Sequence, residues 1–255
     1  MKFLNKIVNR FGYSLVSNQP QIPSDISGDE EFMEIYSKCK PYTMTTVERM
    51  FSLYQAIKYI QENNIEGDFV ECGLWKGGSC MMMAYMLVKM GVTSRKIYLY
   101  DTFEGMSAPT ELDRVSGSGS DADELLKKAD KNDPASVWCY STIDEVKANV
   151  GLTGFPASNF VFVKGKVEDT IPNTTPTKIA LLRLDTDWYE STLHELKYLY
   201  QLLVKNGILI IDDFGFWEGA KKAVLQYFAE NKIYPIINRI DDTGRIIIKA
   251  DNLVV

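Results

Sequence analysis

The sequence of 255 residues has few of the side chains that build soft-metal sites. It contains one histidine, His194, and four cysteines, Cys39, Cys72, Cys80 and Cys139, and no two cysteines form a CxxC pair. The histidine is not close in sequence to any cysteine, which argues against a zinc site of mixed Cys/His type. Four thiols in a chain without a secretory signal fit a reducing compartment better than a disulfide framework, so we expect a cytoplasmic protein.

Long apolar runs and an excess of positive charge are missing as well. No continuous apolar run resembles a signal peptide or a membrane span, so we expect no stable membrane insertion. The net charge of −6 argues against nucleic acid as a partner, because phosphate binding needs clustered Lys and Arg. Residues 2–16 are basic and amphipathic. They favour a helix that packs on its own domain or across a dimer, with weak attachment to a membrane surface as the alternative.

From residue 43 onward, helical and strand patterns alternate, which is typical of a parallel sheet covered on both faces. A helix is predicted from the capping pair Thr45 and Glu48 to about Asn63, and further helices lie between the strands. The predicted strands are residues 68–72, 96–101, 160–164, 178–185 and 207–212, followed by a hairpin of residues 235–240 and 245–249.

These elements predict an α/β protein with a single Rossmann-like domain over residues 43–255, preceded by an N-terminal helical extension over residues 1–42. The sheet is expected to have seven strands, mostly parallel, with an antiparallel strand from the C-terminal hairpin. Residues 102–140 interrupt the rhythm and are too long for a simple connection, so they form either a disordered insert or a functional lid. Because this stretch leaves the carboxyl end of a central strand, we expect a lid-like insertion at about 103–140.

Two features after the first strands are typical of a nucleotide-like ligand. Residues 71–79 (ECGLWKGGS) form a glycine-rich turn before a helix, where backbone N–H groups are free to meet a ligand. The spacing is neither the dinucleotide GxGxxG nor a P-loop, and a plain tight turn is the alternative. Asp101 ends the second strand, where a carboxylate can accept two hydrogen bonds from a ribose diol; a helix cap or loop carboxylate is the alternative.

A group of acids follows two later strands. Asp185 and Asp187 come at the end of one strand, and Asp212 and Asp213 end the next. The carboxyl ends of adjacent parallel strands lie together, so we expect these carboxylates to converge and to repel one another unless a cation is bound. All-oxygen ligands suit a hard divalent ion, namely Mg²⁺ or else Mn²⁺ or Ca²⁺. The alternative is that Arg183 neutralises them as a structural ion pair.

Five segments carry a resemblance to a known family. Residues 67–79, 98–106, 164–172, 181–192 and 209–224 resemble the macrocin O-methyltransferase family in the same order, and the likeness covers about residues 40–250. Members of that family methylate sugar hydroxyls on natural products. The resemblance implies a class I methyltransferase fold, S-adenosylmethionine and Mg²⁺ as cofactors, and a homo-oligomer, dimer or larger.

The resemblance also implies roles for individual residues. Asp101 would hold the ribose, and Val167 and Glu168 would flank the adenine. Asp185 and Asp187 are the expected catalytic carboxylates, with Asp187 as a general base or as a carboxylate beside the metal ligands. The full set of implied cofactor-binding residues is Glu71, Gly73, Gly77, Ser79, Asp101, Thr102, Val167 and Glu168, and the implied metal ligands are Asp185, Asp212 and Asp213.

The expected reaction is transfer of a methyl group to a hydroxyl, most simply that of a sugar in a natural product or glycan precursor. The cation would activate the acceptor oxygen while a carboxylate takes the proton. A catechol-like phenol is an alternative acceptor, although the polar, Ser/Gly-rich segment 107–137 favours a glycan. A non-catalytic nucleotide-binding scaffold and a nicotinamide-dependent oxidoreductase are weaker alternatives. His194, within a predicted helix, is expected to pack rather than to act as the base.

Overall fold

The computed structural model describes residues 22–133 and 136–250. The predicted amphipathic helix over residues 2–16 lies outside the described residues. In the described part of the chain, no helix is long and apolar enough to cross a membrane.

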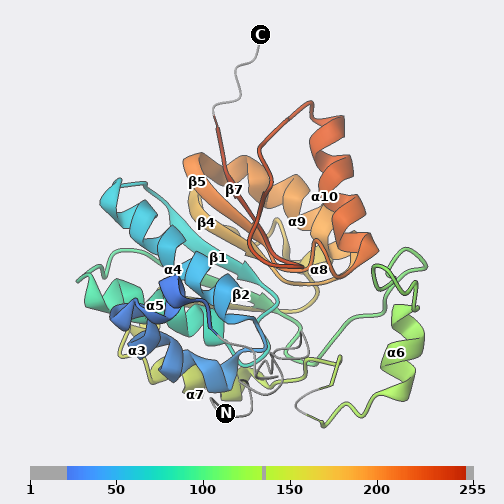
Figure 1. The fold of residues 1–255 in the computed structure, drawn as a ribbon, viewed down its shortest axis with the longest axis horizontal. Helices are drawn as coiled ribbons and strands as arrows, with labels where there is room; N and C mark the ends of the chain where they lie inside the picture. Colours follow the sequence, from blue (N-terminus) through green and yellow to red (C-terminus); the bar gives the residue numbers. More distant parts are fainter. Residues whose placement is uncertain (1–21, 134–135, 251–255) are drawn as a thin grey trace, which may run out of the picture.

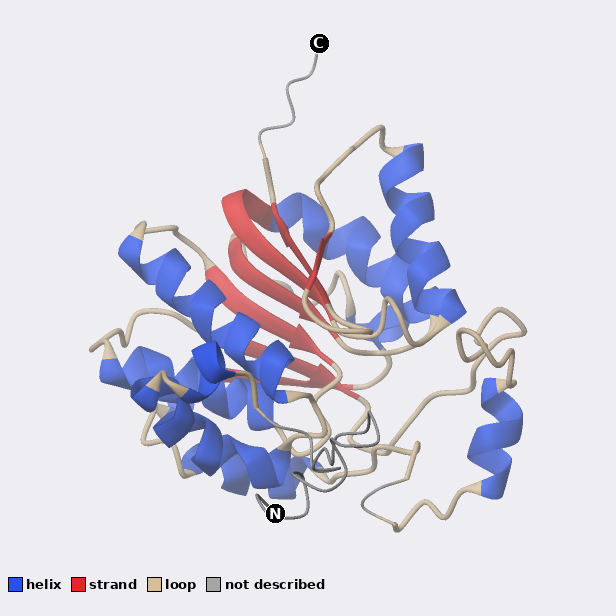
Figure 2. Ribbon diagram, viewed as in Figure 1, coloured by secondary structure: helices blue, strands red, loops and turns tan. Residues whose placement is uncertain are grey.

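Seven strands form one sheet in the order β3-β2-β1-β4-β5-β7-β6 (Figure 2). Strands β1 to β5 are parallel, and β7 runs antiparallel to β5, which confirms the predicted sheet. The strands are β1 (Asp68–Cys72), β2 (Ile97–Asp101), β3 (Phe160–Lys164), β4 (Ile179–Leu184), β5 (Leu203–Ile211), β6 (Asn238–Arg239) and β7 (Arg245–Ile248).

The strand predicted over residues 235–240 is much shorter in the structure. Only Asn238 and Arg239 pair with β7, at the outer edge of the sheet. Pro235 has no N–H to donate to a ladder, and Ile236 is 78% exposed, so the segment before β6 gains little from joining the sheet.

Helices cover both faces of the sheet (Figure 1). One face carries α2 (Ser24–Ser27), α3 (Glu30–Cys39), α4 (Val47–Glu62), α5 (Gly78–Lys89) and α7 (Ile143–Gly151). The other face carries α8 (Val167–Thr170), α9 (Tyr189–Leu199) and α10 (Glu218–Glu230). Short 3₁₀ turns, η2 (Lys40–Tyr42), η3 (Ala157–Asn159) and η4 (Tyr200–Leu202), lie at the ends of longer elements. The helix α6 (Ala122–Lys128) stands apart from the sheet.

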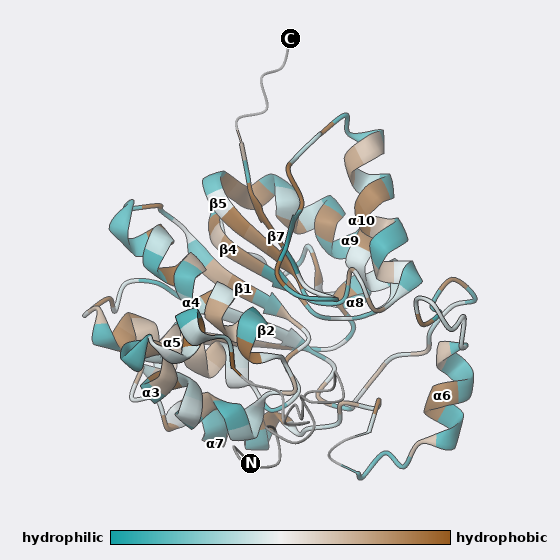
Figure 3. Ribbon diagram, viewed as in Figure 1, coloured by the Kyte–Doolittle hydropathy of each residue, from teal (hydrophilic) through white to brown (hydrophobic). Residues whose placement is uncertain are grey.

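The central strands supply the core between these helix layers. All six residues of β4 are buried, as are the last five of β5, and Figure 3 shows both strands as mainly hydrophobic. Strands buried on both faces are expected to be apolar throughout rather than alternating. Ile26 and Phe32, from α2 and α3, belong to the same buried cluster as Phe69 of β1, so residues 22–42 pack onto the domain.

The helix α4 begins one residue later than its sequence pattern predicted. Thr46, not Thr45, is the N-cap, and its Oγ1 accepts a hydrogen bond from the Arg49 backbone N–H at 3.2 Å. The same hydroxyl donates to Asp241 at 2.6 Å, which favours Thr46 over its neighbour. Arg49 therefore lies in the first turn of α4, beside the carboxyl ends of the strands.

The insertion between β2 and α7 is ordered in the residues described. Arg114 pairs with Asp121, and Val115 pairs with Trp217, in two isolated β-bridges. A small apolar cluster joins α6 to the segments that follow β4 and β5; it contains Ala122, Leu126, Trp188, Trp217 and Ala220. The insertion is thus packed against the rest of the domain.

The buried centre of β4 provides a stability test. Leu181 is fully buried in the core, and Leu181→Ala is expected to lower the free energy of unfolding by about 2–5 kcal/mol, because it leaves a cavity. Leu152 is 60% exposed, and Leu152→Ala is expected to change it by no more than about 0.5 kcal/mol. Urea denaturation measures both. Equal effects of the two substitutions would contradict the placement of β4 in the core.

Candidate active site at the strand ends

A cavity of about 390 Å³ opens at the carboxyl ends of the parallel strands. It lies where the strand order changes direction between β1 and β4, the usual position of ligands in open α/β sheets. Residues predicted as site residues make up much of its wall: Gly73, Ser79, Asp101, Thr102, Val167, Glu168, Asp185, Asp187, Asp212 and Asp213.

Gly73 brings two parts of the site together. Its φ is +82°, a left-handed conformation that favours glycine, and a Cβ there would overlap the carbonyl oxygen of Asp185. Hydrogen bonds fix this approach: the Asp185 N–H donates to the Cys72 carbonyl at 2.8 Å, and the Gly73 N–H donates to the Tyr100 carbonyl at 2.9 Å. The turn after β1 and the acids after β4 therefore share one cavity.

Asp101 is held with its carboxylate in a fixed position at the end of β2. It accepts hydrogen bonds from the backbone N–H groups of Leu74, at 2.7 Å, and Phe103, at 2.6 Å. Burial raises the pKa of Asp101, and these hydrogen bonds oppose that rise. Thr102 follows, and its hydroxyl donates to the Gly105 carbonyl at 2.6 Å.

Glu168 and Val167 form another side of the cavity, at the start of α8. The carboxylate of Glu168 accepts a hydrogen bond from Ser191 of α9 at 2.7 Å. Val167 is buried and presents an apolar surface. An apolar side chain beside a hydrogen-bonded carboxylate suits a flat, polar-edged ring.

Glu71 and Gly77 differ from their predicted positions, because both lie outside the set of residues that line the cavity. Glu71 is fully buried behind the cavity wall, where its carboxylate accepts from Ser79, from Arg183 and from the Cys80 thiol. Gly77 is the N-cap of α5, and a Cβ there would face Val146 rather than a ligand. Glu71 thus acts on the cavity through Ser79, which does line it.

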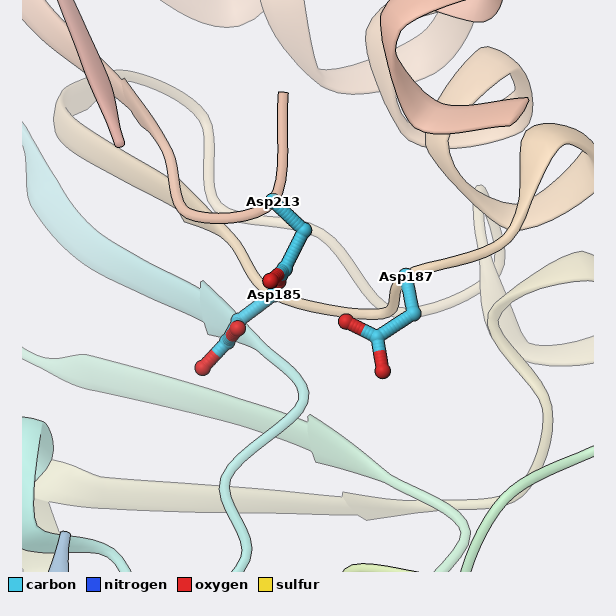
Figure 4. A group of neighbouring side chains, drawn as sticks. All are labelled: Asp185, Asp187 and Asp213. Atoms are coloured by element: carbon cyan, nitrogen blue, oxygen red, sulfur yellow. The ribbon is translucent and has the colours of Figure 1, made fainter. Parts of the chain in front are cut away.

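Three carboxylates converge at the other end of the cavity (Figure 4). Oxygens of Asp185, Asp187 and Asp213 lie within 4.8 Å of one another, on the loops that follow β4 and β5. Desolvation raises the pKa of Asp187 to about 7, and desolvation and neighbouring acids raise the pKa values of Asp185 and Asp213 well above the ordinary range. Three oxygen donors at this spacing fit a hard divalent cation.

Asp212 is placed differently from the sequence prediction. Its carboxylate lies in ion pairs with Arg183, at 2.5 Å, and with Arg49, so the compact acid group contains Asp187 in its place. Asp212 and Asp213 both lie in the bend after β5, and the Asp212 N–H donates to the Leu184 carbonyl at 2.9 Å. The predicted neutralisation by Arg183 is partial: its described ion pairs reach Glu71, Asp185 and Asp212.

Arg49 is a site residue that no sequence pattern indicated. It lines the cavity and pairs with both Asp212 and Asp241. Asp212 is 163 positions away along the chain, so no local spacing indicates the pair. The first turn of α4 and the loop before β7 are thereby tied to the end of β5.

Asp187 has an unusual backbone conformation for a residue with a side chain. Its φ is +68°, which costs about 1–3 kcal/mol and persists only where the surroundings enforce it. The Trp188 N–H donates to the Thr186 carbonyl at 2.7 Å, and the Thr186 hydroxyl donates to the buried Glu195 at 3.0 Å. The turn that carries the acid is therefore held by hydrogen bonds on both sides.

His194 lies away from the acids. Its Nε2 is 2.9 Å from the Ile171 carbonyl, and its ring packs on Tyr198 with 4.6 Å between centroids. Trp75 and Trp217, in contrast, line the cavity.

The fold and the site together define the class of protein. A parallel sheet that ends in an antiparallel strand, a glycine turn after β1 and an acid at the end of β2 are the features of class I S-adenosylmethionine-dependent methyltransferases.

The chain belongs to the macrocin-O-methyltransferase (TylF) family, whose sequence profile matches residues 35–249, and it is an O-methyltransferase. It is 30% identical over 203 residues to 8-demethyl-8-(2,3-dimethoxy-alpha-L-rhamnosyl)-tetracenomycin-C 4'-O-methyltransferase of Streptomyces olivaceus. It is also 30% identical over 203 residues to demethyldecarbamoylnovobiocin O-methyltransferase of Streptomyces niveus. Each match covers 80% of this chain and 74% of the relative.

A solved structure gives the same picture. The O-methyltransferase NovP superposes with a TM-score of 0.70 at 29% identity, covering 82% of this chain and 83% of NovP. The calicheamicin methyltransferase CalS11 shares the fold, with a TM-score of 0.57 at 17% identity. The resemblance predicted from the five sequence segments is confirmed.

Gly73 offers a test of the cavity geometry. Gly73→Ala forces a methyl group against the Asp185 carbonyl and should weaken binding of S-adenosylhomocysteine by at least about ten-fold, measured by calorimetry. Gly91→Ala is the matched control: Gly91 also has positive φ, but a Cβ there would meet no described atom within 4 Å. Unchanged affinity in Gly73→Ala would contradict this account of the β1–β4 contact.

Proposed function

We propose that the enzyme transfers the methyl group of S-adenosylmethionine to a sugar hydroxyl of a natural product or glycan precursor, with Mg²⁺ bound at the acid group. The observation that carries the proposal is the convergence of Asp185, Asp187 and Asp213 in the same cavity as Gly73 and Asp101. The names of the relatives support the acceptor class, since one methylates a rhamnosyl group on tetracenomycin.

The two ends of the cavity suit the two reactants. Asp101, oriented by two backbone N–H groups, would accept hydrogen bonds from a ribose diol. Val167 and Glu168 would flank the adenine, and Gly73 and Ser79 would contact the methionine part. The sulfonium methyl would then point toward the acids, so that the protein aligns methyl and acceptor oxygen for in-line displacement.

Asp185 and Asp213 are the residues that we assign to the cation. Their side chains lie at the ends of adjacent strands, and carboxylate oxygens are the donors that Mg²⁺ prefers. When bound, Mg²⁺ supplies positive charge that lowers the pKa of a neighbouring hydroxyl. Asp212, engaged by two arginines in this structure, holds Arg183 and Arg49 in place beside the acids.

Asp187 is the residue that we assign as general base. Its carboxylate is within 4.8 Å of the other two acids, so it can reach an oxygen held beside them, and carboxylates act as general bases in enzymes. A sugar hydroxyl held among these acids would transfer its proton to Asp187 as the new C–O bond forms.

A catechol-like phenol is a second candidate acceptor, and the acceptor side of the cavity favours it more than the sequence suggested. Met106, Val137, Phe216 and Trp217 line that side. Of the polar segment 107–137, which favoured a glycan, Ser107, Ser136 and Val137 line the cavity, whereas the Ser/Gly run at residues 116–120 does not. Homo-oligomerisation and a cytoplasmic location remain predictions from the sequence and the family resemblance.

Asparagine substitutions separate the two roles among the acids. Asp213→Asn should lower Mg²⁺ affinity and activity together, whereas Asp187→Asn should keep Mg²⁺ and S-adenosylhomocysteine binding but lose about 10²–10⁴-fold in turnover. Transfer from labelled S-adenosylmethionine to a panel of rhamnosides and catechols, with Mg²⁺ or with EDTA, measures turnover. Calorimetry measures binding.

The exposed Asp25 provides the control, since Asp25→Asn should behave like the unsubstituted enzyme. Full activity of Asp187→Asn, or full activity in EDTA, would overturn the assigned roles. Transfer to catechols alone would replace the sugar by the second candidate.

The raised pKa values of the acids predict a pH dependence of metal binding. Protons compete with Mg²⁺ for the carboxylates, so Mg²⁺ affinity should increase by about ten-fold between about pH 6 and pH 8. Carboxyl groups with raised folded-state pKa values stabilise the metal-free protein at low pH, and this contribution is lost as the pH rises through them, near 7 for Asp187. The gain in Tm on adding Mg²⁺ should therefore be larger at pH 8, and an equal gain at both would contradict the assignment.

A further inference from the structure

Asp113, in the insertion, is a fully buried acid that lies outside the residues lining the cavity. Its Oδ1 accepts a hydrogen bond from the Tyr189 backbone N–H at 2.8 Å. Its Oδ2 accepts from the backbone N–H and the hydroxyl of Thr110, at 2.7 and 2.9 Å. Its own carbonyl accepts from the Ala122 N–H at 3.0 Å. One side chain thus joins the insertion to α9.

The bond to Tyr189 completes the start of α9. Tyr189 is the first residue of that helix, and within the described chain its N-cap, Trp188, makes no side-chain capping hydrogen bond. Asp113 supplies that acceptor from 76 positions away, where a negative charge is also favoured by the helix dipole. The helix α9 begins two residues after Asp187. The hydrogen bond from Tyr189 to Asp113 therefore also holds the turn that carries the proposed base.

A second helix start packs against the same carboxylate. Gly219 lies in the first turn of α10, and a Cβ there would overlap Asp113 Oδ1. Next to it, the Glu218 N–H donates to the Arg114 carbonyl at 2.9 Å, and the Ser116 N–H donates to the Phe216 carbonyl at 2.8 Å. These hydrogen bonds hold the loop between Asp213 and α10 against the insertion.

Apolar contacts continue this junction into the acceptor side of the cavity. Trp188 and Trp217 pack edge to face, with centroids 4.9 Å apart. The Trp188 indole N–H donates to the Ser107 carbonyl at 3.0 Å. Ser107, near the start of the insertion, and Trp217, the N-cap of α10, both line the cavity.

We propose that Asp113 is a positioning residue for the acceptor half of the site, an inference that rests on the function proposed above. By accepting a hydrogen bond from the first turn of α9 and packing against Gly219 in the first turn of α10, it sets the insertion wall and the loops of Asp187 and Asp213 in one arrangement. The cofactor residues on the ends of β1 and β2, Gly73 and Asp101, make no described contact with Asp113, whereas Glu168 is connected to α9 through the hydrogen bond from Ser191. No ion pair of Asp113 occurs among the described residues, so its charge is balanced by N–H and O–H donors and by helix starts.

The test compares the acceptor half and the cofactor half of the site in the enzyme of 255 residues. Asp113→Ala removes the carboxylate and with it the hydrogen bond from Tyr189. Gly219→Ala keeps the carboxylate but forces it out of place. Asp113→Asn keeps the shape but replaces one acceptor oxygen with an NH₂ group, and is expected to be intermediate. Asp144→Ala, at an exposed site in α7, and Gly151→Ala, where a Cβ would meet no described atom within 4 Å, are the controls.

Hydrogen exchange measured by mass spectrometry needs no ligand. In Asp113→Ala and Gly219→Ala, amides of residues 105–128, 186–190 and 214–219 should exchange at least about ten-fold faster, while those of residues 72–77 stay unchanged. Calorimetry should show Mg²⁺ affinity reduced by about ten-fold and a smaller loss of S-adenosylhomocysteine affinity, because only Glu168 among the proposed cofactor residues is tied to the start of α9 in this structure.

Faster exchange confined to the insertion, with Mg²⁺ affinity intact, would reduce Asp113 to a local structural role and overturn the proposal. So would unchanged exchange in both Asp113→Ala and Gly219→Ala. If the unsubstituted enzyme binds no Mg²⁺, the proposed metal role fails, while the exchange pattern still decides whether Asp113 couples the insertion to the two acid loops. If Asp113→Ala does not fold, Gly219→Ala and Asp113→Asn carry the same comparison.

Discussion

The site depends on the ion pairs of one buried group, the guanidinium of Arg183. Arg183 is the penultimate residue of β4, is 2% exposed, and reaches three acids: Glu71, Asp185 and Asp212. Glu71 in turn holds Ser79, at the cofactor end of the cavity. A buried charge is tolerated only when it is paired, so Arg183 and these acids stabilise one another. The two halves of the cavity are therefore fixed by one side chain.

Beyond the reach of Arg183, Asp187 and Asp213 form no ion pair among the described residues, and Arg49 acts on them only through space. Asp187 and Asp213 lie close to Asp185, and desolvation raises the pKa of both. Asp187 and Asp212 raise the pKa of Asp213 further, whereas the hydrogen bond with Asp213 lowers the pKa of Asp187. This arrangement costs stability in the absence of a cation, which supports the proposed site for a divalent ion. The insertion, anchored by Asp113, gives the loops of these acids a second support outside the sheet. Cofactor binding and acceptor activation are thus built on different parts of one fold.

The sequence was sufficient for the sheet because strands buried on both faces have to be apolar, and because glycines and acids follow the strand ends. It was insufficient for the direction of each side chain. Asp212 and Asp213 are neighbours with the same chemistry, and only the register of β5 decides which one meets Asp187. Arg49 and Asp113 could not be selected either, since their partners lie 163 and 76 positions away and are brought near by folding alone.

The most direct test of the account is the position of a bound metal. Crystals grown with S-adenosylhomocysteine and Mn²⁺ in place of Mg²⁺ would give an anomalous difference map in which the ion is seen without ambiguity. The account predicts a peak between the carboxylates of Asp185 and Asp213, with Asp187 facing the acceptor side and the ribose on Asp101. A cofactor bound as described with no peak among these acids would contradict the metal-assisted mechanism.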